Sequence, residues 1–162
     1  MASFEITRRD GSVHTVLVDD EDLGRVIAAG PWRVHAPNSG NTLYAIRDIY
    51  VDGKRTTQYL HRFLLDAGNF EIDHINCDGL DNRRANLRIA TPSQNQHNRG
   101  AQRDNKSGYK GVTLDKRRGK WMAQIALEGK RRSLGLHATP ELAHAAYCRA
   151  AAELHGKFAR IA

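Results

Sequence analysis

The first part of the chain alternates apolar and polar residues in short runs, a pattern that is typical of half-buried β-strands. Residues 4–8 and 13–18 form one pair of runs around an Asp-Gly dipeptide, and residues 43–51 and 54–60 form a second pair around another. Asp-Gly between two such runs is a strong hairpin signal. The acidic residues just before residues 23–29 suit a helix N-terminus, so a short helix is predicted there, ended by Gly-Pro.

The middle of the chain predicts a short helix, two strands and a second helix. Residues 60–65 have the pattern of a helix, residues 70–75 and 87–90 that of two strands, and the polar residues 76–86 that of the loop between them. The Thr-Pro-Ser-Gln run at residues 91–94 then supplies an N-cap, a proline at the first helical position and a capping-box partner. A helix is therefore predicted to begin at this run.

The last third of the chain predicts three short antiparallel strands followed by one helix. The strands are expected over residues 109–114, 121–127 and 131–136, with connections short enough for hairpins. In the middle strand Trp121, Ala123, Ile125 and Leu127 share one face, whereas Met122, Gln124 and Ala126 share the other. A helix is predicted from Thr139 to about His155. Its expected packing stripe consists of Leu142, Ala146, Ala150 and Leu154.

Together these patterns predict an α+β fold, mostly antiparallel in its N-terminal section. Four sections are expected: a β-rich section over residues 1–58, a strand-loop-strand-helix section over residues 59–99, a polar linker over residues 100–107, and a three-stranded sheet packed on one helix over residues 108–162. No internal repeat is visible.

Composition excludes some classes and favours a reducing compartment. No apolar run approaches the roughly 20 residues that a membrane-spanning helix needs, and the first residues lack the features of a signal peptide. Two cysteines, Cys77 and Cys148, form no disulfide framework, so a cytoplasm is the simplest setting. Without a Cys-x-x-Cys pair, a structural zinc knuckle is not expected.

Positive charge is concentrated in one segment. The chain has a formal net charge of +7. Between Arg103 and Arg132 ten basic residues face three acidic ones, a net +7, so this segment accounts for the whole excess. A solvated, solubilising face is the plain interpretation of such charge. It does not explain the concentration, which favours a polyanionic partner.

The polar residues around the predicted middle hairpin are of the types that a site for phosphodiester hydrolysis needs. Asp73 and His74 end an apolar run, Asn86 follows His74 by twelve residues, and Asn95 follows Asn86 by nine. A histidine can activate water, an Asp and an Asn can hold a divalent metal, and a second Asn can orient the histidine. Each residue also has a plain structural interpretation, as a hairpin histidine, a strand-end acid, or an asparagine of a loop or helix start.

In order and spacing these residues resemble the HNH endonuclease motif in its His-Asn-Asn form, as found in phage and mobile-element (homing) enzymes. The resemblance implies a ββα-metal core with His74 as general base, Asn86 orienting its ring, and Asp73 and Asn95 as metal ligands. Mg²⁺ is the expected metal and Mn²⁺ is possible, because both accept oxygen ligands. His97 and Asn98 are alternative second ligands, and Asn82 is the nearest competitor of Asn86. His61 is interpreted as structural or phosphate-contacting.

The C-terminal section resembles the DNA-binding domain of plant ethylene-response factors, through Tyr-Lys-Gly-Val at residues 109–112, Gly-Lys-Trp at 119–121, Leu-Gly at 134–135 and Ala-Ala-Tyr at 145–147. That family places a sheet face in the major groove, which implies base contacts by Lys110, Gln124 and Arg131. The hairpin-loop residues Lys116, Arg117, Arg118 and Lys120 would contact phosphates. Ser133 and Ala126 depart from the plant pattern, so base readout is expected to differ.

The sequence therefore predicts a metal-dependent HNH DNA endonuclease that nicks or cuts double-stranded DNA. Arg83, Arg84 and Arg88 are further candidate phosphate contacts. No small-molecule cofactor and no membrane partner are expected, monomer and dimer both stay open, and the expected setting is a cytoplasm, that of a bacterial host if the gene belongs to a phage. The alternatives are a non-catalytic DNA-binding protein with a degenerate HNH unit and, less favoured, an RNA-binding protein.

Overall fold

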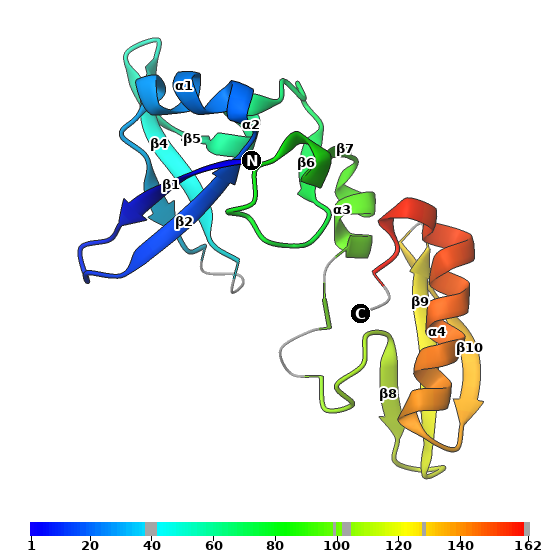
Figure 1. Ribbon diagram of the computed structural model, residues 1–162. Coiled ribbons are helices and arrows are strands. Elements are labelled where there is room, and N and C mark those ends of the chain that lie inside the picture. The colour runs from blue at the N-terminus through cyan, green and yellow to red at the C-terminus, as the bar shows by residue number, and fades with distance from the viewer. Residues whose placement is uncertain (38–41, 99, 102–104, 128, 161–162) are drawn as a thin grey trace. The chain divides into compact units, whose positions relative to one another are not determined.

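In the computed structural model the chain divides into two units, Met1–Thr91 and Pro92–Ala162. The structure describes residues 1–37, 42–98, 100–101, 105–127 and 129–160 (Figure 1). Arg103, Asp104 and Glu128 of the basic segment, and part of the predicted linker, lie outside these ranges. Each described sheet is antiparallel, and the described residues contain four α-helices, as an α+β fold requires.

In chain order, the first unit begins with a β-hairpin, a helix and a three-stranded sheet. β1 (Ala2–Thr7) pairs with β2 (Val13–Val18), and α1 (Asp20–Ala29) follows. A three-stranded sheet then has the order β3-β4-β5, formed by β3 (Arg33–His35), β4 (Tyr44–Val51) and β5 (Lys54–Tyr59). The Asp52-Gly53 turn between β4 and β5 has positive φ at both residues, 49° and 73°, which confirms the predicted hairpin.

The rest of the first unit contains the predicted hairpin of the HNH motif. α2 (Leu60–Leu64) leads into β6 (Glu71–His74), which pairs with β7 (Leu87–Ala90) after a short 3₁₀ turn, η1 (Arg84–Asn86). The hydrophobic core of this unit combines strand, helix and loop residues: Ile6, Val16, Val18, Val26, Ala45, Leu60, Leu64 and Leu80. Because Leu80 belongs to the loop between β6 and β7, that loop packs into the core of the unit.

The second unit begins with α3 (Pro92–Asn98) and continues with the predicted sheet and helix. β8 (Val112–Asp115), β9 (Lys120–Leu127) and β10 (Lys130–His137) form a sheet in the order β10-β9-β8. α4 (Pro140–His155) packs on it and ends in a 3₁₀ turn, η2 (Gly156–Phe158). Ala123 and Ile125 are buried, as the predicted inner face of β9 requires.

The predicted packing stripe of the last helix was right at its centre and wrong at its two leucines: Ala146 and Ala150 are partly buried and pack against the core, whereas Leu142 and Leu154 do not face it. Leu142 is 54% exposed and Leu154 38% exposed, whereas the buried residues of α4 are Ala143, Tyr147, Ala151 and His155. Tyr147 packs against Gly111, where an added Cβ would lie 2.2 Å from the tyrosine ring. The glycine makes room for one large ring flanked by alanines, so the helix sits too close to the sheet to bury leucines there.

Candidate functional site

Asp73 and His74 end β6 and are almost completely buried, with 4% and 5% of their surfaces exposed. Their strand is held in register by β7, where Asp73 lies opposite Arg88 and His74 opposite Leu87. The backbone beyond the strand is held too, since Ile75 donates its N–H to the Asn86 carbonyl at 2.9 Å. The two residues on which the HNH prediction depends most are therefore fixed in place by main-chain bonds.

Two aromatic rings pack against the His74 imidazole, and a third packs on those two. The ring of His61 lies 5.1 Å from it, centroid to centroid, at an interplanar angle of 86°. Tyr44 contacts both histidines at 5.8 Å, and Tyr59 lies 5.2 Å from His61. His61 was expected to be structural or phosphate-contacting, and its ring is one wall around His74. The sequence carries no signal for the approach of Tyr44, which comes from β4.

Burial determines the charge state of both histidines. Desolvation lowers the pKa of His61 to about 3, with the neighbouring His74 and Arg62 acting in the same direction. Desolvation also lowers the pKa of His74, against the opposing effects of Asn82 and the nearby carboxylates of Asp73, Asp78 and Asp81. At neutral pH both rings are uncharged, and a neutral imidazole is the form that can accept a proton.

A fully buried side chain, that of Asn82, lies at the edge of the His74 ring. Its Oδ1 lies 3.5 Å from His74 Nε2, and its Nδ2 donates to the Gly79 carbonyl at 3.3 Å. Because the amide group donates to Gly79, its oxygen faces the ring. An acceptor at Nε2 favours the tautomer that is protonated there, so that Nδ1 carries the lone pair.

Asn86 holds the loop rather than the ring. Its Oδ1 accepts from the Asn76 N–H at 3.0 Å, and its Nδ2 donates to Asn76 Oδ1 at 2.9 Å and to the Asp81 carbonyl at 2.7 Å. These bonds match the loop-tying interpretation of this asparagine. The catalytic role assigned to Asn86 stays a prediction, and in this geometry it would act through the loop backbone.

The loop between β6 and β7 is attached to the N-terminal hairpin. Leu17 of β2 donates its N–H to the Leu80 carbonyl at 2.9 Å and accepts from the Asn82 N–H at 2.8 Å. Gly79 approaches β4 so closely that an added Cβ would lie 2.4 Å from the Leu43 carbonyl oxygen. Residues of the N-terminal β-rich section thus support the residue that contacts the His74 ring.

The Asp73 carboxylate pairs with Arg88 from the adjacent strand. Arg88 Nε and Nη2 lie 2.7 and 2.5 Å from Asp73 Oδ2, and both side chains are largely buried. The other two arginines of the HNH section that were predicted to contact DNA, Arg83 and Arg84, also have acidic partners in the chain. Arg83 pairs with Asp81 at 2.6 Å, and Arg84 pairs with Asp22 at 2.8 Å. Their DNA contacts stay predictions, and each would be made by an arginine already in an ion pair.

Asn95 lies on α3 and so belongs to the second unit. This helix is attached within its own unit by a ring stack: His97 and His155 lie 3.6 Å apart, centroid to centroid, at 6°. Lys110 Nζ also donates to the His97 carbonyl. The assignment of Asn95 as a ligand, with His97 and Asn98 as its alternatives, stays a prediction, as does the assembly of β6, β7 and α3 into a ββα-metal core.

The predicted DNA-reading face is the face of the second sheet opposite α4. Cross-strand neighbours share a face, and Arg131 pairs with Ala126, Ser133 with Gln124 and Thr113 with Met122. Arg131 and Gln124 are thus on the same open face. In the β8–β9 turn Arg118 bonds Asp115 at 2.9 Å, whereas Lys116, Arg117 and Lys120 are exposed. Lys110 precedes β8 and is directed to α3.

Two family models match the chain in the regions that this geometry separates. Residues 65–97 match the model described as HNH endonuclease, and residues 107–157 match the model described as AP2 domain. Over 91 residues the chain is 36% identical to Protein 3.8 of Escherichia phage T7. This match covers 56% of this chain and 74% of the phage protein. The chain belongs to the HNH endonuclease family. Its C-terminal part is an AP2 domain, so both resemblances are confirmed.

A second viral relative agrees with this assignment. Over 107 residues this HNH family member is 31% identical to a protein of Acanthamoeba polyphaga mimivirus that is described as an uncharacterized HNH endonuclease. The match covers 62% of this chain and 54% of the mimivirus protein, so the chain spans about half of that relative. No solved structure matches the chain. Membership supports a nuclease or DNA-binding role at the family level, with DNA as the partner. Within the described residues, no helix is both long and apolar enough to span a membrane.

Proposed function

We propose that this protein is a metal-dependent endonuclease that hydrolyses phosphodiester bonds in double-stranded DNA. The observation that carries the proposal is the Asp73-His74 pair at the end of β6, where a buried imidazole is kept neutral and an amide oxygen is placed at its Nε2. A neutral, oriented histidine beside a carboxylate is what general-base hydrolysis requires. The HNH family match covers these residues.

In the proposed reaction His74 accepts a proton from a water molecule through Nδ1, the nitrogen left with a lone pair when Nε2–H faces Asn82. The resulting hydroxide attacks phosphorus, and the bond from phosphorus to the 3′ oxygen breaks. The products are a 5′-phosphate and a 3′-hydroxyl end. Asn82 keeps the tautomer, and the surrounding rings of His61 and Tyr44 exclude bulk water from the imidazole.

The donor set fits a hard divalent cation held by few protein ligands. Asp73 offers a carboxylate and Asn95 an amide oxygen, and Mg²⁺ commonly binds through one or two carboxylates while it keeps several waters. No group of three or more His, Cys, Asp or Glu residues that could hold a metal occurs in the described part of the chain. A bound Mg²⁺ or Mn²⁺ would stabilise the charge that develops on the leaving 3′ oxygen. Asp73 would share its carboxylate between that cation and Arg88.

The AP2 domain is proposed to supply most of the affinity for the duplex. Its exposed Lys116, Arg117 and Lys120 can neutralise phosphates, and Gln124 and Arg131 lie together on the open face of the sheet. Because one relative comes from a phage, the proposed setting is the cytoplasm of a bacterial host.

The test is conversion of supercoiled plasmid to nicked or linear DNA with Mg²⁺, with and without EDTA. Nicking that EDTA abolishes supports the proposal. In a matched pair, Asp73→Asn should weaken Mg²⁺ binding measured by calorimetry, whereas Asp78→Asn, an exposed carboxylate in the following loop, should not. Equal metal affinity for Asp73→Asn and the wild type would move the ligand to another carboxylate.

One observation favours a second candidate, a non-catalytic DNA-binding protein with a degenerate HNH unit. The guanidinium of Arg88 places two N–H groups on the same Asp73 oxygen, so a cation is already paired with the proposed metal ligand. The AP2 domain suits either candidate. If the purified protein shifts duplex DNA but leaves plasmid intact with both Mg²⁺ and Mn²⁺, this second candidate replaces the first.

A further inference from the structure

A basic groove lies in the first unit, away from the Asp73-His74 pair. It has a volume of about 750 Å³ and is lined by the end of β1, the turn that follows it, and residues of β3, β4 and β5. Its charged residues are four arginines and two aspartates, a net +2: Arg8, Arg9, Arg33, Arg55, Asp10 and Asp48. In Figure 1 the β1–β2 turn lies at the end of this unit opposite β6.

One carboxylate arranges two of these arginines. Asp48 accepts from Arg33 Nη2 through Oδ1 at 3.0 Å and from Arg55 Nη2 through Oδ2 at 2.7 Å. Each guanidinium has five N–H donors, so both retain donors beyond this bond. Both side chains stay at least half exposed. A single negative charge thus holds two guanidinium groups in place without neutralising them.

The remaining charges add to this positive surface. Asp10 is bonded within its own turn by the N–H and hydroxyl of Ser12, and Arg8 lies 3.6 Å from it. Arg9 is exposed and makes no ion pair within the described ranges. The groove therefore presents three arginines whose charge is only partly compensated: Arg9, Arg33 and Arg55.

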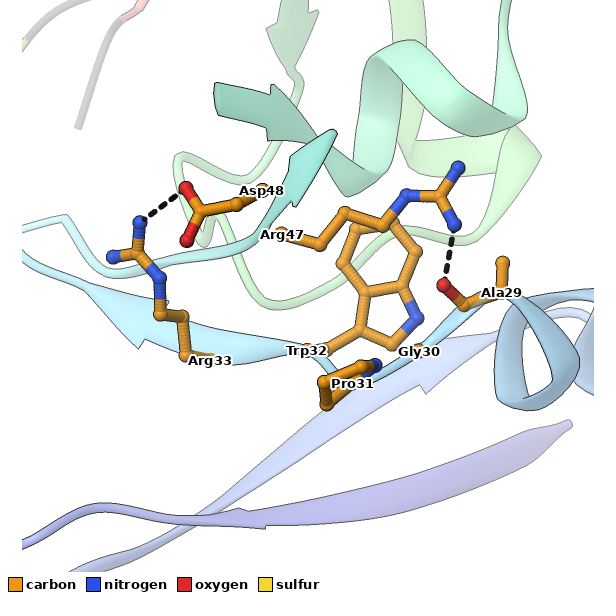
Figure 2. A pocket seen from close by; sticks show the side chains of 7 residues that line it. All are labelled: Ala29, Gly30, Pro31, Trp32, Arg33, Arg47 and Asp48. Carbon is orange, nitrogen blue, oxygen red and sulfur yellow. Dashed lines mark hydrogen bonds and ion pairs between the residues drawn. The ribbon is translucent and has the colours of Figure 1, made fainter. Parts of the chain in front are cut away.

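Arg47, close by, shows what a structural arginine looks like in the same sheet. Its guanidinium lies 5.1 Å from the Trp32 ring centroid and 4.7 Å from that of Phe63. It donates to the Ala29 carbonyl, and its Nε donates to Gln58 at 2.8 Å. A smaller pocket shares Arg33 and Asp48 with the groove. Figure 2 shows this pocket, with Arg47 over the Trp32 indole and Arg33 extending to Asp48 at the other side. The donors of Arg47 are used within the fold, unlike those of Arg33 and Arg55.

The local charge matters because the first unit as a whole is acidic. Residues 1–91 contain 11 basic and 13 acidic residues, a net −2, which would repel a polyanion. A concave basic surface on such a unit concentrates positive potential at one place. Arginine forks also match the geometry of phosphate oxygens better than ammonium groups do.

We propose that this groove binds the phosphate backbone of duplex DNA at a second surface, separate from both the AP2 domain and the Asp73-His74 site. The inference rests on the proposed function, because it takes DNA as the ligand. Its charged donors are arginines, whose N–H groups match phosphate oxygens, so the proposed contacts are to the phosphate backbone. The phosphates it binds lie away from the bond that is cut, so it orients the duplex across the first unit.

The test is a salt titration of binding to a labelled mixed-sequence duplex in EDTA, where no cleavage occurs, with the full-length protein. The test variant is Arg9→Gln with Arg55→Gln, and the control is Lys54→Gln. Lys54 is adjacent to Arg55 in β5, so its side chain points to the opposite face of the sheet. Each lost phosphate contact should reduce the log-log salt slope by about 0.9. Raising the salt from about 50 to 200 mM weakens binding by some factor in each protein. For the double variant that factor should be about 10 times smaller than for the wild type.

A gain-of-binding variant guards against misfolding as an explanation. Asp48→Asn removes the negative charge beside Arg33 and Arg55, keeps an oxygen that can accept from one of them, and should steepen the log-log salt slope by about 0.9, the value of one phosphate contact, so that binding tightens most at the lower salt. A damaged fold would not improve affinity. Salt curves of the double variant and of Lys54→Gln that superimpose would overturn the inference. In that case binding by the wild type would leave the DNA-directed function standing, whereas no binding by the wild type would overturn both.

Discussion

The two units of this protein differ in where their polar residues lie: the first buries many of them, whereas the second has a large excess of positive charge. The first, Met1–Thr91, has a net charge of −2 but buries Asp22, His61, Asp73, His74, Asp81, Asn82 and Asn86. The second, Pro92–Ala162, has 14 basic and 5 acidic residues, a net +9, and its buried polar residues in the described ranges are Asn98 and His155. Buried polar groups require fixed hydrogen-bond partners, whereas surface charge acts at a distance. On the proposed function, the buried polar residues of the first unit would serve the general-base chemistry, and the surface charge of the second would serve the long-range attraction of DNA.

The largest expected effect is that of a substitution at His74, which should change the cleavage rate without changing the affinity for DNA. His74→Ala should lower the cleavage rate by about 10² to 10⁴-fold, the usual contribution of a general base, while duplex affinity stays within about twofold. Single-turnover cleavage and fluorescence anisotropy measure the two quantities. His14→Ala, a histidine of β2 with a Ser12 contact, is the control and should cleave normally. Wild-type cleavage by His74→Ala would remove the catalytic role from the first unit.

The second prediction is the opposite case, in which the affinity for DNA falls while cleavage is kept. Replacing Lys116, Arg117 and Lys120 with glutamine should reduce the salt slope by about 2.7 and weaken duplex binding by orders of magnitude at physiological salt. Cleavage should persist at low salt and high protein concentration, because the Asp73-His74 pair is unchanged. Arg149→Gln, an exposed cation of α4, serves as control. If the slope stays the same, the AP2 domain is not the main DNA anchor and the comparison fails.

The third prediction concerns which asparagine orients the base. Asn82→Ala should lower the cleavage rate about 10-fold and shift the His74 tautomer away from the Nε2–H form, since its acceptor at 3.5 Å is lost. Two-bond ¹H–¹⁵N spectra report the tautomer directly. Asn86→Ala is the matched comparison, and should destabilise the loop by about 1–3 kcal/mol while the tautomer is kept. A tautomer change in Asn86→Ala alone would return the orienting role to Asn86.

The smallest predicted effect is a pH dependence that belongs to the buried histidines. The folded-state pKa of His61 is about 3, below its ordinary value, so between these values the unfolded chain binds a proton that the native protein does not. Stability should therefore be complete at neutral pH and fall on acidification, by at most about 1.4 kcal/mol per pH unit for this group. Urea titrations from neutral to acidic pH measure this slope. His61→Phe should flatten it, and an unchanged slope would assign the dependence to other groups.

Local patterns were enough to predict most of the elements. The Asp52-Gly53 turn, the helix whose first turn holds the acidic run, and β7 over Leu87–Ala90 follow from turn chemistry, capping and alternation within a few residues. The packing stripe of α4 could not be predicted the same way. Whether Leu142 or Ala143 faces the sheet depends on the space that Gly111 leaves for Tyr147, and those residues are over thirty positions apart.

The candidate site divides in the same way. Asp73, His74 and Asn95 were proposed as site residues from their order and spacing and from the HNH resemblance, and these assignments stay predictions. The contact between Asn82 and His74, the ring of His61 beside it, and the partners of Arg83, Arg84 and Arg88 depend on long-range pairings that no local pattern encodes. Arginines near a motif suggest phosphate contacts, and only the fold shows that carboxylates such as Asp22 lie beside them.

The attachment of the β6–β7 loop to β2 has a consequence for engineering. Leu17 holds Leu80 and Asn82 through its own main-chain groups, so no side-chain substitution at position 17 can replace or mimic that connection. A designer who transplants only residues 59–99 onto another DNA-binding scaffold would carry the motif without its support. The smallest portable cassette therefore has to include the N-terminal hairpin as well as the motif, and libraries aimed at tuning the nuclease should leave the backbone geometry of that hairpin untouched.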